Sequence, residues 1–173
     1  MNNNKQKPVK IGATSGTYDP VTNGHMDLIK KSANLCEKLL VIISTGRTKK
    51  TIFTEDERVN LLQNEIKKAG IKNAEVRICK PENIIQFMGE QKVGTFFRGV
   101  RNEVDIEFEN NVLFEKYKDK FAEHNIGVAH IKSDPNLVDV SSTNAKKFIN
   151  NELELSKIVS ADVANALKSK IGG

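Results

Sequence analysis

The residues best suited to chemistry lie in one stretch of the chain, Ser15-Gly16-Thr17-Tyr18-Asp19-Pro20-Val21-Thr22-Asn23-Gly24-His25. Its glycines allow a ligand to approach the backbone closely. Thr17 offers a hydroxyl and an N–H, and Thr22 or Asn23 can cap a helix that begins just behind them. His25 then falls in the first helical turn, where free N–H groups and the helix dipole favour an anion. This stretch, residues 15–25, is the histidine loop, and it predicts a phosphate-binding site. A lone capping histidine, by contrast, would be an ordinary structural feature.

Cationic and hydroxyl side chains further along the chain fit the same chemistry. Lys49 and Lys50 follow an apolar run. Arg98 and Arg101 present two guanidinium forks close together, which suits a polyphosphate. The run 141–143 (Ser-Ser-Thr) can begin a helix while its donors face a phosphate. Each feature alone is more typical of a solvated surface or a helix start, and their combination with the histidine loop favours a site.

The common glycine-rich nucleotide motifs are absent from the sequence. It contains no G-x-G-x-x-G and no G-x-x-x-x-G-K-[ST]. The segment 12–16 (Gly-Ala-Thr-Ser-Gly) resembles such a loop superficially but lacks the lysine that would bind phosphate. A phosphate site must therefore depend on the histidine loop and the later cations.

Alternating strands and helices are expected to position these side chains. Short apolar runs predict strands at residues 8–14, 39–44, 74–78, 94–97 and 128–131. Helical spacing and capping signals predict helices at about 25–36, 54–70, 82–91, 102–121, 142–150 and 160–171. This order predicts an α/β fold with a five-stranded parallel sheet covered by helices on both faces.

Parallel sheets of this kind bind ligands outside the carboxyl ends of their strands, where the strand order reverses. His25, Lys49 and Arg98 follow the first, second and fourth expected strands, so we expect them to converge. Residues 1–7 are polar and without periodicity, and predict a flexible tail before a single domain of residues 8–173.

Length and composition narrow the class of protein. The 173 residues suit one domain, and 38% hydrophobic with 28% charged residues exclude a largely disordered chain. The longest apolar run, 39–43, is too short for a membrane span or a signal-peptide core. Cys36 and Cys79 form no disulfide framework and no metal-ligand spacing, which is typical of the reducing cytoplasm.

The net charge of the chain does not by itself identify the class of ligand. A formal net charge of +5 fits either nucleic acid or small phosphorylated ligands. The chain has no Trp and only two Tyr, so it lacks the aromatic platforms on which bases stack. We therefore expect a cytoplasmic protein with neither a nucleic-acid nor a membrane partner.

Four motifs resemble those of the nucleotidylyltransferase superfamily. Residues 16–25 fit its T/H-x-G-H signature and, more closely, the G-T-[FY]-D-P-x-T-x-G-H of bacterial phosphopantetheine adenylyltransferases. Residues 49–58 resemble that family's K-K-x-x-F-[ST]-x-x-E-R, and residues 98–109 its R-G-[LV]-R-x-x-x-D-[FY]-E-x-E. Residues 140–146 resemble its [IV]-S-S-[ST]-x-x-[KR]. The resemblance covers about residues 9–170 and implies a single Rossmann-like domain.

The resemblance implies adenylyl transfer from ATP to 4'-phosphopantetheine, giving dephospho-coenzyme A and pyrophosphate. The incoming phosphate is already a nucleophile, so catalysis would consist of positioning the reactants and neutralising charge. Mg²⁺ is expected with ATP, held by phosphate oxygens and water, because the sequence shows no dedicated carboxylate cage. The resemblance also implies a homohexamer and feedback binding of coenzyme A.

The matched motifs imply roles for individual residues. His25 and Lys49 are the expected catalytic residues. The acceptor is expected to contact Thr17, Lys49, Ile84 and Arg98. The residues expected to contact ATP are Thr17, Tyr18, His25, Gly99, Val100, Arg101, Glu109, Leu137, Val138, Asp139, Val140, Ser141, Ser142 and Thr143. No residue is expected to bind a metal directly.

The chain departs from the family pattern around the adenine and the pantetheine arm, while the phosphate-binding motifs are intact. The departures are Ser15 for a common proline, Leu137 or Val138 for an aromatic residue, Lys116-Tyr117 for an Asn-[KR] pair, and Asn83 or Ile84 for a leucine.

Three alternatives remain open. A sister transferase acting on nicotinamide mononucleotide or glycerol phosphate would share the core motif, but would be expected to carry His in place of Thr22. The second is a binding module that has lost catalysis. The third is a nucleic-acid binder, whose affinity would fall steeply with salt. Pyrophosphate release separates any of the transferases from the other two.

Overall fold

A parallel sheet forms the centre of the computed structural model, which describes residues 9–46 and 50–172. The sheet order is β3-β2-β1-β4-β5, with every neighbouring pair parallel. The strands are β1 (Val9–Gly16), β2 (Cys36–Ser44), β3 (Ala74–Cys79), β4 (Thr95–Val100) and β5 (Gly127–Lys132). The expected tail 1–7 and Lys49 lie outside the described residues.

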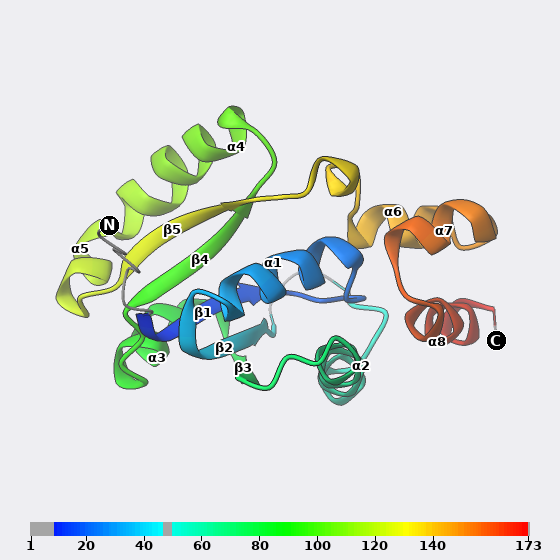
Figure 1. Cartoon of the computed structure of the whole chain (residues 1–173), viewed down its shortest axis with the longest axis horizontal. Coiled ribbons are helices and arrows are strands. Elements are labelled where there is room, and N and C mark those ends of the chain that lie inside the picture. The colour runs from blue at the N-terminus through cyan, green and yellow to red at the C-terminus, as the bar shows by residue number, and fades with distance from the viewer. Residues whose placement is uncertain (1–8, 47–49, 173) are drawn as a thin grey trace, which may run out of the picture.

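Helices connect the strands and follow the last of them. They are α1 (Asn23–Ala33), α2 (Glu55–Lys68), α3 (Ile84–Glu90), α4 (Glu103–Phe108), α5 (Glu115–Glu123), α6 (Ser142–Lys147), α7 (Glu152–Ile158) and α8 (Ala161–Ile171). Short 3₁₀ turns lie at η1 (Pro81–Asn83) and η3 (Pro135–Leu137), and a π-helical segment, η2 (Glu109–Phe114), joins α4 to α5. Figure 1 shows α4 to α5 running along β4 and β5, with α6 to α8 at the opposite end of the molecule. Within the described ranges, no helix is long and apolar enough to cross a membrane.

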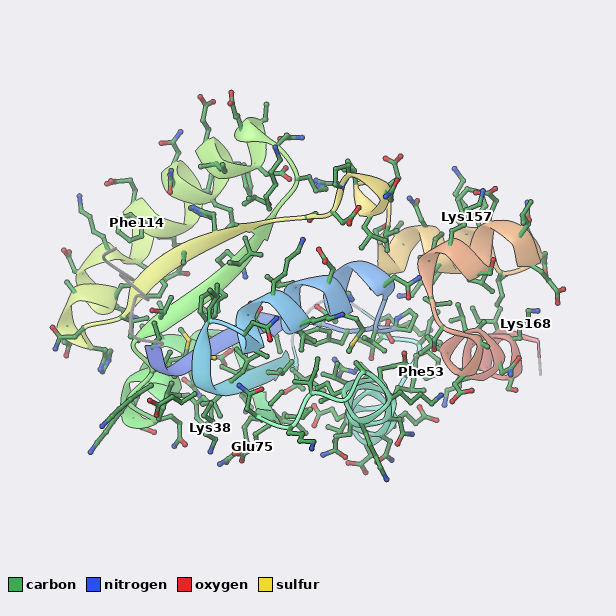
Figure 2. The ribbon with its side chains drawn as sticks, in the orientation of Figure 1. Lys38, Phe53, Glu75, Phe114, Lys157 and Lys168 are labelled. Carbon is green, nitrogen blue, oxygen red and sulfur yellow. The ribbon has the colours of Figure 1, made fainter. Side chains whose placement is uncertain are left out.

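The sheet is buried on both faces, as the sequence predicts. On β2, Leu39, Val41 and Ile43 belong to a core with residues of α1, α2 and α8, while Leu40 and Ile42 belong to a second core with α3 and α5. Phe53, from the segment after β2, lies beside α2 in the first core (Figure 2). The two alternating sets explain why β2 reads as one continuous apolar run.

The strand order reverses between β1 and β4. The chain runs from β1 outward to β2 and β3, and then returns to the other side of β1 for β4 and β5. In such sheets the crevice beyond the carboxyl ends at this point is the usual ligand site. The histidine loop follows β1 and the Arg98–Arg101 segment ends β4, so both lie at this crevice.

Three strand boundaries differ clearly from the expected ones. The first strand was expected to end at residue 14, but β1 continues to Gly16, so Ser15 lies on the strand and not in the loop after it. Cys36 was expected in the first helix, but it begins β2, where it pairs with Val9 of β1. β4 continues past residue 97 to Val100 because its ladder with β5 also continues, with Arg98 opposite His130. Arg98 therefore projects from a strand and not from the loop after it.

The helices differ in two places. The helix expected at 102–121 is interrupted by the π-helical turn of η2, which begins at Glu109. α7 was not predicted, because the expected helices at 142–150 and 160–171 left the residues between them unassigned. In the structure α6 ends at Lys147, and the Asn151 side chain accepts from the Glu154 N–H to begin α7.

Candidate active site

His25 is held at the start of α1 by a reciprocal cap. Thr22 is the extended N-cap residue, and its Oγ1 accepts from the His25 backbone N–H at 3.3 Å. In return, the His25 Nδ1 accepts from the Thr22 backbone N–H at 3.0 Å. Histidine thus takes the position that Glu or Gln holds in the usual capping box. The cap fixes the ring beside the free N–H groups of the helix.

The cap also determines the charge of the imidazole. An Nδ1 that accepts from a backbone N–H carries no proton, so the proton of the neutral ring is on Nε2. Burial lowers the pKa of His25 to about 4. At neutral pH the ring is therefore a neutral N–H donor, whose Nε2 is free of the cap.

An NMR titration of His25 tests this state. We expect its ¹⁵N shifts to show the Nε2–H tautomer from about pH 8 down to about pH 5, with protonation only near pH 4. Folding lowers the pKa from 6.5, so the unfolded chain binds the proton more readily and stability falls as the pH drops from 6.5 towards 4. An imidazolium at pH 6 in the folded protein would contradict the cap geometry.

Tyr18 packs against His25 from the protein core. Its side chain is buried, and its ring centroid lies 4.8 Å from that of His25. Burial raises the pKa of the Tyr18 phenol, so the hydroxyl stays protonated. The ring also packs against Gly16, where an added Cβ would lie 3.2 Å from it. The side chain of Tyr18 therefore positions the loop from the core side.

Arg98 and Glu109 form one ion-paired unit. Nε and Nη2 of Arg98 donate to Oε2 and Oε1 of Glu109 at 3.0 and 2.8 Å. The guanidinium also lies over the ring of Phe96, with Cζ 5.4 Å from the ring centroid. Arg98 was expected to contact the acceptor and Glu109 to contact ATP. In the structure the two side chains pair with each other. Within the described ranges, Nη1 of Arg98 has no partner, so it is available to a ligand.

Two cavities meet at Ser15 and Arg98, which line both of them. The larger, about 600 Å³, lies among α3, β4 and α5 and includes Ile84 and Tyr117. The smaller, about 220 Å³, lies at the start of α1 and includes His25. Reactants bound in the two cavities would meet beside Ser15 and Arg98.

The structure brings some of the expected site residues together and leaves others apart. His25, Arg98, Gly99, Arg101 and Val140 line the smaller cavity, and Ile84 and Arg98 line the larger one. Thr17 is exposed on the loop. The side chains of Tyr18 and Val100 are buried. Neither cavity lining includes Leu137, Val138, Asp139, Ser141, Ser142 or Thr143.

The Ser-Ser-Thr run begins α6, as one of its expected roles requires. Ser141 is the N-cap residue, and its Oγ accepts from the Asn144 N–H at 3.1 Å. The Ser142 Oγ donates to the Pro20 carbonyl at 2.8 Å, which ties α6 to the histidine loop. Ser142 thus already donates its hydroxyl proton within the protein, whereas Ser141 uses its oxygen as the cap and Thr143 is exposed.

A buried carboxylate that the sequence analysis left without a role holds the loops together. Asp19 is only 4% exposed and accepts from the Ile52 and Phe53 N–H groups and from Lys146 Nζ, the last at 2.7 Å. Burial alone would raise the pKa of Asp19, but the bonds from Lys146, Phe53 and Ile52 outweigh it and hold that pKa below its usual range. Asp19 joins the histidine loop, the segment after β2 and α6.

Arg58 is a second residue without a predicted role. It is 3% exposed, and its Nη1 donates to the carbonyls of Thr17 at 2.9 Å and Ser44 at 3.4 Å. A buried arginine thus orients the backbone at Thr17. Asp19, Arg58 and Lys146 are all residues that the four sequence motifs specify. Their positions in those motifs could have identified them as candidate structural residues of the site.

Comparisons with known proteins agree with the motifs. The model of the cytidylyltransferase-like family matches residues 13–148. The phosphopantetheine adenylyltransferase of Shouchella clausii is 32% identical over 160 residues, covering 92% of this chain and 97% of that protein. The enzyme of the same name from Wolbachia pipientis is 32% identical over 158 residues, covering 91% of each chain.

Solved structures confirm the fold. The nicotinic acid mononucleotide adenylyltransferase of Plasmodium falciparum, complexed with NaAD, superposes with a TM-score of 0.63 at 19% identity, covering 95% of this chain and 96% of that one. A bifunctional NMN adenylyltransferase/ADP ribose pyrophosphatase from Francisella tularensis gives 0.69 at 12% identity, covering 95% of this chain and 50% of that one. At these identities the likeness shows the fold alone, whereas the curated relatives show the family. The chain belongs to the phosphopantetheine adenylyltransferase family of cytidylyltransferase-like proteins.

Proposed function

We propose that this chain transfers the adenylyl group of ATP to 4'-phosphopantetheine, releasing pyrophosphate and dephospho-coenzyme A. The observation that carries the proposal is the meeting of two cavities at Ser15 and Arg98, with His25 on the smaller side. The names of the full-length relatives support the choice of acceptor. ATP would occupy the smaller cavity and the acceptor arm the larger one.

The reaction is an in-line exchange at phosphorus. An oxygen of the acceptor phosphate forms a bond to the α-phosphorus of ATP, and the bond from that phosphorus to the oxygen bridging it to the β-phosphate breaks. Negative charge grows on the α-phosphate and on the departing pyrophosphate. Nε2–H of His25 and the free N–H groups at the start of α1 donate to that charge. The phosphate needs no general base, so holding the reactants in place is the main catalytic task.

Arg98 binds at the boundary between the reactants. Glu109 holds Nε and Nη2, which leaves Nη1 of Arg98 directed by that pair to receive the acceptor phosphate. Thr17 and Ile84 remain proposed contacts of the acceptor, and Lys49 remains a proposed catalytic and acceptor-binding residue. The proposed ATP contacts are Thr17, Tyr18, His25, Gly99, Val100, Arg101, Glu109 and residues 137–143.

Mg²⁺ is proposed to enter with ATP. Residues 9–46 and 50–172 bring no three His, Cys, Asp or Glu side chains together as a metal cage. The proposed ligands of the ion are triphosphate oxygens and water. When bound, it would supply charge neutralisation on the phosphates. We also propose a homohexamer, feedback binding of coenzyme A and a cytoplasmic location, each on the strength of the family.

Pyrophosphate release tests the proposed function. The protein is incubated with ATP, Mg²⁺ and either 4'-phosphopantetheine or pantetheine, and pyrophosphate is measured. We expect release only with the phosphorylated acceptor, because pantetheine lacks the attacking oxygen. No release with 4'-phosphopantetheine at saturating ATP would overturn the proposal.

Replacing Arg98 by lysine is expected to raise the KM for 4'-phosphopantetheine about tenfold, with a smaller effect on the KM for ATP. An ammonium lacks the planar fork of a guanidinium, so it cannot reproduce the two parallel bonds to Glu109 and the fixed direction of the remaining donor. Arg77→Lys is the matched control, since Arg77 pairs with Glu75 on β3, away from both cavities. Equal and negligible changes in both constants for Arg98→Lys would make Arg98 an ordinary surface arginine.

A further inference from the structure

Ser15 combines two features that no assigned role explains. It is a lining residue of both cavities, and it stands where the motif that the sequence resembles commonly has a proline. Proline has neither a side-chain hydroxyl nor a backbone N–H, so this chain carries a hydrogen-bonding group that the usual residue cannot supply. The position is the last but one residue of β1, at the crevice where the sheet order reverses.

Strand geometry places Ser15 on the same face of the sheet as Arg98. Ala13 pairs with Phe96 across β1 and β4, and both belong to the core beneath α3 and α5. Alternate residues of a strand point to the same face of a sheet. Ser15 on β1 and Arg98 on β4, each two residues further along, therefore lie on the same face as Ala13 and Phe96. The hydroxyl and the guanidinium thus stand on adjacent strands at the junction of the two cavities.

The Ser15 hydroxyl has no competing partner. Residue 15 is half-buried, and its Oγ makes no hydrogen bond within the described residues. By contrast, hydroxyls of the neighbouring loops are engaged: the Thr22 Oγ1 in the α1 cap and the Ser142 Oγ on the Pro20 carbonyl. A hydroxyl without a partner, in a partly desolvated cavity that a cation also lines, is suited to a phosphate oxygen.

We propose that the Ser15 Oγ donates a hydrogen bond to the phosphate of the acceptor, beside Arg98, and thereby contributes to the selection of a phosphorylated acceptor. The inference rests on the proposed function. The junction is where the acceptor phosphate must lie if its oxygen is to reach an α-phosphate in the smaller cavity. The uncharged arm extends from that point into the larger cavity, away from Ser15.

Single substitutions at Ser15 test the hydrogen bond. Ser15→Ala removes only the hydroxyl, and Ser15→Thr restores it. We expect Ser15→Ala to raise the KM for 4'-phosphopantetheine about tenfold with the KM for ATP unchanged, and Ser15→Thr to recover most of the loss. Ser156→Ala is the matched control, since Ser156 is exposed on α7 and bonds only the Leu153 carbonyl.

Calorimetry with two ligands then locates the contact. Ser15→Ala should weaken binding of 4'-phosphopantetheine about tenfold and leave binding of pantetheine unchanged, because pantetheine has no phosphate to lose. Equal weakening of both ligands would place the contact on the arm and overturn the inference. Wild-type constants in Ser15→Ala would overturn it as well, while leaving the proposed function intact. If the wild-type protein itself forms no product with 4'-phosphopantetheine, the proposed function fails first and the inference fails with it.

Discussion

Replacing His25 by alanine is expected to lower kcat by roughly 10²–10³-fold, the loss seen when one donor to transition-state charge is removed. The KM for ATP should change little, because the other phosphate contacts remain. The physical basis is the cap: the Thr22 N–H occupies Nδ1, so Nε2–H is the group that donates to the growing charge. Steady-state kinetics at saturating acceptor measure the effect.

A second variant separates catalysis from capping. Alanine also removes the Nδ1 acceptor of the α1 cap, which should cost about 1 kcal/mol of unfolding free energy. His25→Gln restores an acceptor at the capping-box position, so it should recover that stability but not the turnover. Near-normal turnover in His25→Ala, or recovery of turnover together with stability in His25→Gln, would show that His25 acts only as a cap.

Asp19→Ala is expected to lower the free energy of unfolding by about 3–5 kcal/mol, because it leaves the Lys146 ammonium and two backbone N–H groups without their buried acceptor. Urea denaturation with an unchanged m-value measures the loss. Since folding holds the pKa of Asp19 below its usual range, the stabilisation is complete above that range and is lost as the pH falls through the lowered pKa.

Asp162→Ala provides the control for Asp19. Asp162 forms an ion pair with Lys68, but its side chain is 59% exposed, so its removal should change stability by less than about 1 kcal/mol. Lys146→Met leaves both backbone bonds of Asp19 in place and should fall between the two. Similar stabilities for Asp19→Ala and Asp162→Ala would show that the histidine loop, the segment after β2 and α6 are held together by other contacts.

The sequence predicts features that depend on local spacing. Thr22 and His25 stand at the spacing of an N-cap and its third residue, so the helix start and the place of His25 followed directly. The continuous apolar run of β2 similarly predicted a strand buried on both faces. That the ring nitrogen of His25 would close the capping box depends on a side-chain rotamer, which no spacing reveals.

Features that join distant segments could not be predicted in the same way. Asp19 meets Ile52, Phe53 and Lys146 only after the sheet has formed, and apart from its place in the motif nothing local distinguishes it from an exposed turn aspartate. The pairing of Arg98 with Glu109 depends on the extra length of β4 and on the π-helical turn that begins at Glu109.

The choice of acceptor is the most direct test of the proposed activity. The protein is incubated with ATP and Mg²⁺ and with 4'-phosphopantetheine, nicotinamide mononucleotide or glycerol phosphate in turn, and the products are identified by mass. We expect dephospho-coenzyme A as the dominant product, because the larger cavity, about 600 Å³ and lined by Arg98, Ile84 and Tyr117, has room for an arm beyond the phosphate. Faster adenylylation of nicotinamide mononucleotide or glycerol phosphate than of 4'-phosphopantetheine would contradict the assigned activity.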